Sequence, residues 1–112
     1  MSAAFALLAS VFLAGAAWAG DGGVAESHMR KGLSCTSCHG EVKQYAPVQK
    51  AQCVACHDTK TLAAKTAKVA PTNPHENRHY GTEADCNLCH RAHQPSVNFC
   101  ADCHARFNFK VK

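Results

Sequence analysis

The sequence predicts a small, mainly α-helical domain with much irregular loop and little or no β-sheet. The chain has 112 residues, including 8 Cys and 8 His. From Gly20 onward it carries only 14 large apolar side chains (Leu, Val, Phe and Met), with no Ile. This number of large apolar residues is too small to form a conventional hydrophobic core. We therefore expect covalent cross-links or metal sites to hold the fold together. No alternating apolar and polar run indicates a strand, and the length excludes a large nucleotide-binding α/β enzyme.

Residues 1–19 have the features of a secretory signal peptide. An apolar run from Ala3 to Ala17 is followed by Ala17-Trp18-Ala19, a small-x-small cleavage site before Gly20. A membrane anchor is the alternative, but the run is shorter than the roughly 20 residues that span a bilayer. The first five residues carry no Lys or Arg, which leaves the true start codon open. We therefore expect a mature domain of residues 20–112 in the periplasm, without stable membrane insertion.

All cysteines lie in four pairs of identical spacing, each followed directly by His. The motifs are Cys35-Thr-Ser-Cys38-His39, Cys53-Val-Ala-Cys56-His57, Cys86-Asn-Leu-Cys89-His90 and Cys100-Ala-Asp-Cys103-His104. CxxCH attaches c-type haem: the two sulfurs bind the haem covalently and the His becomes the proximal iron ligand. A lone CxxC could be half of a zinc site or a redox disulfide, but neither requires His after all four pairs. We therefore expect four haem c groups.

The histidines outside the motifs are candidate distal iron ligands. They are His28, His75, His79 and His93. Eight histidines provide two ligands for each of four irons, which predicts low-potential, bis-histidine haems without an open position for substrate. A solvated surface residue is the alternative for each of them, and Met29 could replace one distal His. No CxxCK motif occurs, so a Lys-ligated catalytic haem has no candidate and we expect no catalytic residues.

Sequence separation limits which histidine can serve which haem. His93 follows His90 by three residues, too few to reach the opposite face of the same porphyrin, so we expect it to ligate a different haem. His75 and His79, if helical, lie on one face at i and i+4 and serve two different haems. When histidines that are close in sequence bind different haems, the porphyrins are brought close together, as electron transfer between them requires.

Short helices are expected to carry these motifs. Residues 47–52 can form one, with Pro47 near its first turn and Cys53 at its end. A clearer helix runs from about Lys60 to Ala70 and stops before Pro71. We expect N-caps at Thr82 and Ser96 for short helices carrying the third and fourth motifs, and a turn at Pro71-Thr-Asn-Pro74.

Other side chains are expected to surround the haems or face solvent. Lys60, Lys65 and Lys68 form one face of the clearer helix, either solvated or used for docking. The aromatic residues are expected to pack on porphyrins; they are Tyr45, Tyr80, Phe99, Phe107 and Phe109.

The order of motifs resembles that of the small tetrahaem cytochromes c, class III-like multihaem proteins, and of the haem domain of periplasmic flavocytochrome c fumarate reductases. The resemblance covers most of residues 28–104. It implies the ligand pairs His28 with His57, His75 with His90, His79 with His104, and His93 with His39. In that family the paired histidines are usually separated by two residues (HxxH), whereas three residues separate His75 from His79 here. It also implies that the flavin domain is missing or separately encoded.

These observations predict a periplasmic electron carrier, such as anaerobic respiration uses, rather than an enzyme. Its expected partners are redox proteins: a quinol-linked donor, and a terminal reductase or extracellular acceptor. The first alternative is a haem subunit of a separately encoded reductase, and the second is a haem enzyme that has lost one distal His. The chain has a net charge of +4, but export disfavours nucleic acid as a partner. We expect a monomer.

Overall fold

The computed structural model describes residues 22–112, so the predicted signal peptide and its cleavage site lie outside the described residues. Within that range the helices are α1 (Val24–Met29), α2 (Thr36–His39), α3 (Lys50–Val54) and α4 (Thr59–Lys65), followed by the 3₁₀ helices η1 (Cys86–Leu88) and η2 (Phe99–Asp102). Loops join them, and β-type pairing over residues 22–112 is limited to one bridge between Asn77 and Gly81. The predicted mainly helical, irregular fold with little or no sheet is confirmed.

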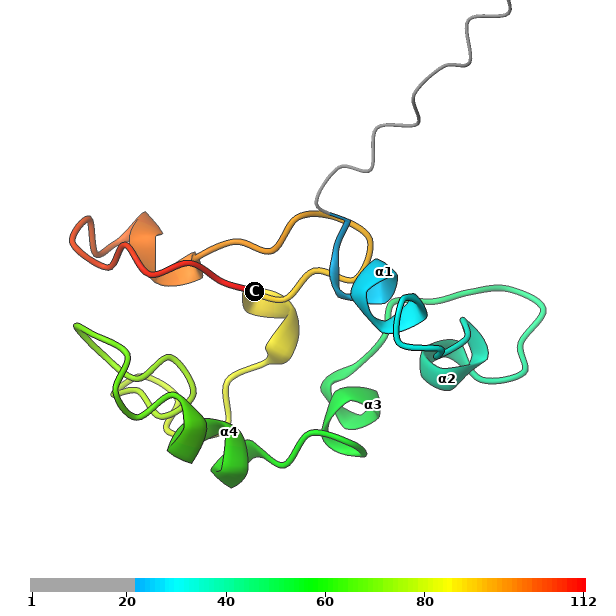
Figure 1. Cartoon of the computed structure of the whole chain (residues 1–112), viewed down its shortest axis with the longest axis horizontal. Helices are drawn as coiled ribbons and strands as arrows, with labels where there is room; N and C mark the ends of the chain where they lie inside the picture. The colour runs from blue at the N-terminus through cyan, green and yellow to red at the C-terminus, as the bar shows by residue number, and fades with distance from the viewer. Residues whose placement is uncertain (1–21) are drawn as a thin grey trace, which may run out of the picture.

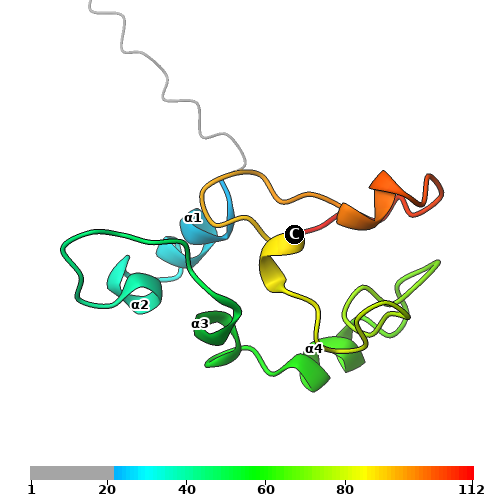
Figure 2. The same cartoon turned by 180° about the vertical axis from the view of Figure 1, so that it is seen from behind.

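The helices are short and follow one another along a winding chain, without forming layers (Figures 1 and 2). Ala63, 5% exposed, is the one buried apolar side chain among the described residues. Larger apolar side chains such as Tyr45, at 62% exposure, face outward. A small domain normally offsets its conformational entropy by burying such groups. The exposed apolar surface is what bound prosthetic groups would cover.

Helix α1 is attached to the segment that follows the third motif. The Val24 amide donates to the Arg91 carbonyl at 2.9 Å, and the Ala25 amide donates to the Ala92 carbonyl at 2.8 Å. Gly23 permits this approach, because a Cβ atom there would lie 2.2 Å from the Arg91 oxygen. Figure 1 shows this loop, in orange, passing beside α1. The first helix is therefore anchored by residues far along the chain.

Helix α3 packs beside η1 and so joins the second motif to the third. The Asn87 side-chain amide donates to the Val48 carbonyl at 2.9 Å. The Lys50 ammonium donates to the Glu83 carbonyl at 2.9 Å and forms an ion pair with its carboxylate at 3.1 Å. These contacts, between residues more than 30 positions apart, hold the middle of the chain together.

The predicted helix at residues 47–52 begins and ends later than expected. Gln49 and Gln52 form a capping box, in which the Gln49 amide donates to the Gln52 side chain at 3.0 Å. This box starts α3 at Lys50, so Pro47 precedes the helix and Cys53 lies inside it. The predicted bounds of residues 47–52 were shifted because a local capping pair sets the start.

Helix α4 ends five residues before the predicted boundary at Ala70. The Thr66 hydroxyl lies 2.8 Å from the Leu62 carbonyl oxygen. The Asn73 side-chain amide donates to the Ala63 carbonyl at 2.8 Å. The Asn73 amide thus occupies the Ala63 carbonyl, which the Ala67 amide would bond in a longer helix, and the helix stops well before the proline.

The predicted N-caps of the last two helices were also wrong. Asp85 caps η1, accepting a hydrogen bond from the Asn87 amide at 2.9 Å. Asn98 holds the N-cap position of η2 without a capping side-chain bond. Both caps lie closer to their motifs than Thr82 and Ser96, since each motif occupies a single 3₁₀ turn.

His75 and His79 lie in turns, so the helical arrangement considered for them does not occur. The Asn73 side-chain oxygen accepts from the His75 amide, and that of Asn77 accepts from the His79 amide, both at 3.0 Å. Asparagine turns of this kind compete with helix formation. In the part of the chain that the structure describes, no helix combines the length and apolar character needed to cross a membrane.

Candidate functional site

Each motif histidine faces one histidine from outside the motifs. The ring centres of His28 and His57 are 5.9 Å apart and their planes are at 86°. The rings of His39 and His93 are 6.2 Å apart with planes at 5°, and those of His75 and His90 are 6.1 Å apart with planes at 1°. The rings of His79 and His104 are 6.1 Å apart with planes at 40°. These are the four pairs that the resemblance implies. His93 faces the first motif and not the third, in which its neighbour His90 lies.

The ring spacing fits two imidazoles that bind one metal from opposite sides. A metal–nitrogen bond of about 2 Å on each side, plus about 1 Å from nitrogen to ring centre, puts the ring centres roughly 6 Å apart. Two protein ligands complete a six-coordinate iron whose other four positions belong to a porphyrin. The paired residues therefore fit a haem.

Two of the paired imidazoles are oriented by main-chain oxygens. Nδ1 of His28 lies 2.6 Å from the Val24 carbonyl oxygen, and Nδ1 of His90 lies 3.1 Å from the main-chain oxygen of Lys112. Since these oxygens can only accept, each Nδ1 carries the proton and donates. The lone pair then lies on Nε2, which is the arrangement of a metal-binding histidine with an outer hydrogen-bond partner.

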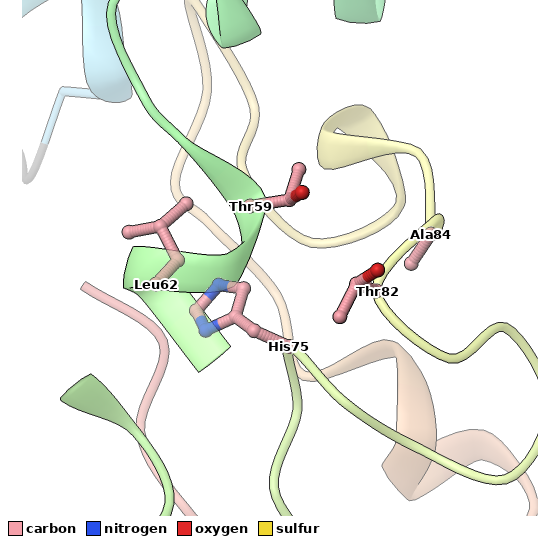
Figure 3. A pocket seen from close by; sticks show the side chains of 5 residues that line it. All are labelled: Thr59, Leu62, His75, Thr82 and Ala84. Atoms are coloured by element: carbon pink, nitrogen blue, oxygen red, sulfur yellow. The ribbon is translucent and has the colours of Figure 1, made fainter. Parts of the chain in front are cut away.

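His75 lies beneath α4 in the most enclosed of these pairs. Burial lowers its pKa, and neighbouring His90 acts in the same direction. A lower pKa keeps the imidazole neutral, the form that binds metal. Figure 3 shows the ring of His75 beside α4 in a small pocket; the other lining residues are Thr59, Leu62, Thr82 and Ala84.

Cysteines of successive motifs are neighbours. None of the eight is joined to another in a disulfide. Burial and the adjacent Cys86 thiol raise the pKa of Cys53 to about 11, with smaller contributions from Cys38 and Asp85. Burial and the nearby Cys89 likewise raise the pKa of Cys100. The second motif thus lies near the first and the third, and the third lies near the fourth.

Aromatic side chains lie against several of the paired histidines. The Tyr45 ring centre is 4.7 Å from that of His39, and the Phe107 ring stacks on His104 at 4.4 Å with planes 13° apart. Tyr80 lies 6.2 Å from His79. These contacts place three of the predicted aromatic residues at the first and fourth histidine pairs.

Sequence reasoning missed the residues that orient the ligands. Thr66, Asn73 and the main-chain oxygen of Lys112 contact His75 or His90 directly or through one another. The Asn73-Pro74 step before His75 signals an asparagine turn, which was the available clue for Asn73. The part played by Thr66 depends on where α4 ends, and the spacing of apolar residues does not reveal this.

Four CxxCH motifs around four imidazole pairs, on a chain with almost no apolar core, define a multihaem c-type cytochrome. Residues 27–105 match the family model for cytochrome c3, and the chain belongs to that family. It is therefore a multihaem electron-transfer protein that uses haem c.

Two characterised proteins are similar to this chain. The acrylate reductase cytochrome subunit of Shewanella woodyi is 42% identical over 77 residues, covering 65% of this chain and 64% of that protein. The cytochrome c-type protein Cgr1 of Eggerthella lenta is 37% identical over 51 residues, covering 45% of this chain and 23% of that protein. The similarity therefore spans less than two thirds of either relative. No solved structure is a significant match.

Proposed function

We propose that this chain is a periplasmic electron carrier with four low-potential haem c groups, each ligated by two histidines. The observation that supports this most is the set of four imidazole pairs, each with one motif and one non-motif histidine at 5.9–6.2 Å. Every cysteine lies in a CxxCH motif. Both the covalent attachments and the axial ligands are thus accounted for without surplus residues.

Cysteines and histidines have separate roles in binding the haems. Paired cysteines attach each haem, the motif histidine supplies the proximal nitrogen, and its partner supplies the distal one. When bound, haem c supplies a one-electron couple at low potential. With one imidazole of each pair on either side, the iron would have no free position for substrate, which would leave electron transfer as the activity.

The arrangement of the motifs supports electron transfer along the chain in sequence order. Cys53 lies near both Cys38 and Cys86, and Cys100 lies near Cys89. Helix α3 and η1, which carry Cys53 and Cys86, also pack together. Neighbouring attachment points favour short steps between the first and second, second and third, and third and fourth sites.

The proposed location follows from the N-terminal segment. Residues 1–19 act as a signal peptide, and residues 20–112 form the mature haem domain, which works as a monomer in the periplasm. In this compartment it exchanges electrons with redox proteins: a quinol-linked donor on one side, and a terminal reductase or extracellular acceptor on the other.

The test is the intact mass of the protein purified from a host that matures c-type cytochromes. We expect a chain beginning near Gly20 with four covalently attached haems, and no stoichiometric carbon monoxide binding after reduction. Free thiols, bound zinc, fewer haems or one equivalent of bound carbon monoxide would contradict the proposal.

A second function is favoured by one comparison. The relative from Shewanella woodyi is described as the cytochrome subunit of an acrylate reductase. By analogy, this chain serves as the haem subunit of a separately encoded reductase. Co-purification of a stable catalytic chain with the tagged cytochrome from its native host would support this role, and recovery of the cytochrome alone would support the free carrier.

A further inference from the structure

A cluster of polar groups lies at Nδ1 of His75. The Thr66 hydroxyl is at its centre, 2.6 Å from the Asn73 side-chain oxygen, 2.8 Å from the Leu62 carbonyl oxygen and 3.1 Å from Nδ1 of His75. All of these contacts are partly buried. The cluster joins the end of α4 to the turn that carries the histidine.

The polarity of the fixed groups determines where the protons lie. The Asn73 amide nitrogen donates to the Ala63 carbonyl, so its oxygen faces the His75 amide and the Thr66 hydroxyl. The hydroxyl has one proton, and the three oxygens near it, on Asn73, Leu62 and, at 3.5 Å, Ala63, can only accept it. No hydroxyl proton remains for His75. Nδ1 of His75 must therefore be the donor, and the Thr66 oxygen the acceptor.

We propose that Thr66 is a positioning residue for His75, setting its tautomer and lowering the reduction potential of the haem that His75 shares with His90. This inference rests on the proposed function, in which these two histidines ligate one iron. Donation from Nδ1 makes Nε2 a stronger electron donor, because an outer hydrogen-bond partner raises ligand basicity. A stronger donor stabilises ferric over ferrous iron, which lowers the potential.

The opposite ligand is held in a similar way. Nδ1 of His90 lies 3.1 Å from the main-chain oxygen of Lys112. Figures 1 and 2 both show the C-terminus beside η1. The planes of His75 and His90 differ by 1°, the smallest angle among the four pairs. The third site thus has both imidazoles bonded to protein oxygens, and we expect it to have the lowest potential.

The experiment compares three variants of the complete holoprotein by redox titration, with each haem assigned by paramagnetic NMR. Thr66→Val keeps the shape of the side chain and removes the acceptor oxygen. We expect the reduction potential of the haem held by His75 and His90 to rise, and no other. The expected rise is ~59 mV for one electron, which is about a tenfold change in the equilibrium constant for reduction of that haem. Thr66→Ser restores the hydroxyl and should return the potential toward its original value. Thr61→Val, at an exposed position of α4, should leave all four potentials unchanged.

The outcomes separate this inference from the proposed function. Four attached haems in every variant with no shift of the third potential in Thr66→Val would overturn the inference alone, as would a failure of Thr66→Ser to restore it. Fewer than four haems in the unmodified protein would contradict the proposed function. If Thr66→Val does not mature, Thr66→Ala is titrated with the same expected rise, and an unchanged third potential in that variant overturns the inference.

Discussion

The third and first histidine pairs have similar ring geometry but very different surroundings. In both pairs the planes are nearly parallel, at 1° for His75 with His90 and 5° for His39 with His93. Both imidazoles of the third pair contact protein oxygens through Nδ1. The first pair, among the described residues, has no such hydrogen bond, and His39 follows an exposed stretch at residues 31–38.

The difference shows that the polypeptide determines ligand orientation to different degrees along one chain. Beneath α4, the position of His75 is set by Thr66 and Asn73. At the first site, His39 is held by its short helix and by its contact with Tyr45, and His93 by the segment that anchors α1. We therefore expect the positions of His39 and His93 to depend more on the bound haem than the positions of His75 and His90 do.

The largest contrast is expected on removing a distal ligand. His93→Ala should open the first haem and His75→Ala the third, and each variant should gain one high-spin iron that binds carbon monoxide. Added imidazole should restore the low-spin state at the exposed first site at lower concentration than at the enclosed third site. Equal restoration would break the comparison, and an opened haem at His90 in the His93 variant would refute the pairing.

A smaller effect is expected where α1 meets the segment carrying His93. A Cβ atom on Gly23 would lie 2.2–2.6 Å from the carbonyl oxygens of Arg91, Gln94 and Ala92. Gly23→Ala should therefore separate the two segments and reduce the free energy of unfolding by about 2 kcal/mol, through overpacking and lost hydrogen bonds.

The comparison variant is Gly22→Ala, whose new Cβ atom has the side chain of Glu26 as its nearest neighbour, including the Glu26 Cβ atom at 2.9 Å, instead of the carbonyl oxygens of residues 91–94. We expect it to cost less stability than Gly23→Ala, because it leaves the hydrogen bonds between the two segments in place. Urea unfolding of the two holoproteins measures this difference. Equal stability of the variants would show that the anchoring of α1 does not matter.

The C-terminal segment offers a test of the third site alone. The Asn98 amide donates to the carbonyls of Phe107 and Phe109 and so holds the strand of chain that brings Lys112 to His90. Asn98→Ala should cost about 1–2 kcal/mol and raise the third potential by less than Thr66→Val does. Asn108→Ala, at an exposed neighbouring position, should do neither. A shift at the first haem would contradict the assignment.

The smallest expected effect concerns the ion pair between the second and third motifs. The hydrogen bond from Lys50, with a further one from Thr82, holds the pKa of Glu83 below its ordinary value of 4.5. A lowered pKa in the folded state adds stability above pH 4.5, and this stability is lost as the pH falls through the folded pKa. Glu83→Gln should thus lower the melting temperature slightly at pH 7 and not at pH 3. A larger loss at pH 3 would contradict the sign.

The candidate ligands could be named from the sequence because CxxCH is a local pattern, and the structure places the eight histidines in four pairs. The pairing of His28 with His57 came from the family resemblance, because it depends on long-range folding. The helix starts were mispredicted because local caps at Gln49 and Asp85 were overlooked in favour of Pro47 and Thr82. The role of Thr66 could not be predicted, since it joins α4 to a turn seven residues further on.

The central claim, four bis-histidine haems with the ring orientations seen here, is tested most directly by quantitative electron paramagnetic resonance of the oxidised holoprotein. Near-parallel imidazole planes give rhombic low-spin spectra, whereas near-perpendicular planes give a signal with one very large g value. We predict four low-spin irons per chain: rhombic signals from the first and third sites, and a large-g signal from the second, where His28 and His57 lie at 86°. A high-spin iron, or four identical low-spin signals, would contradict the account.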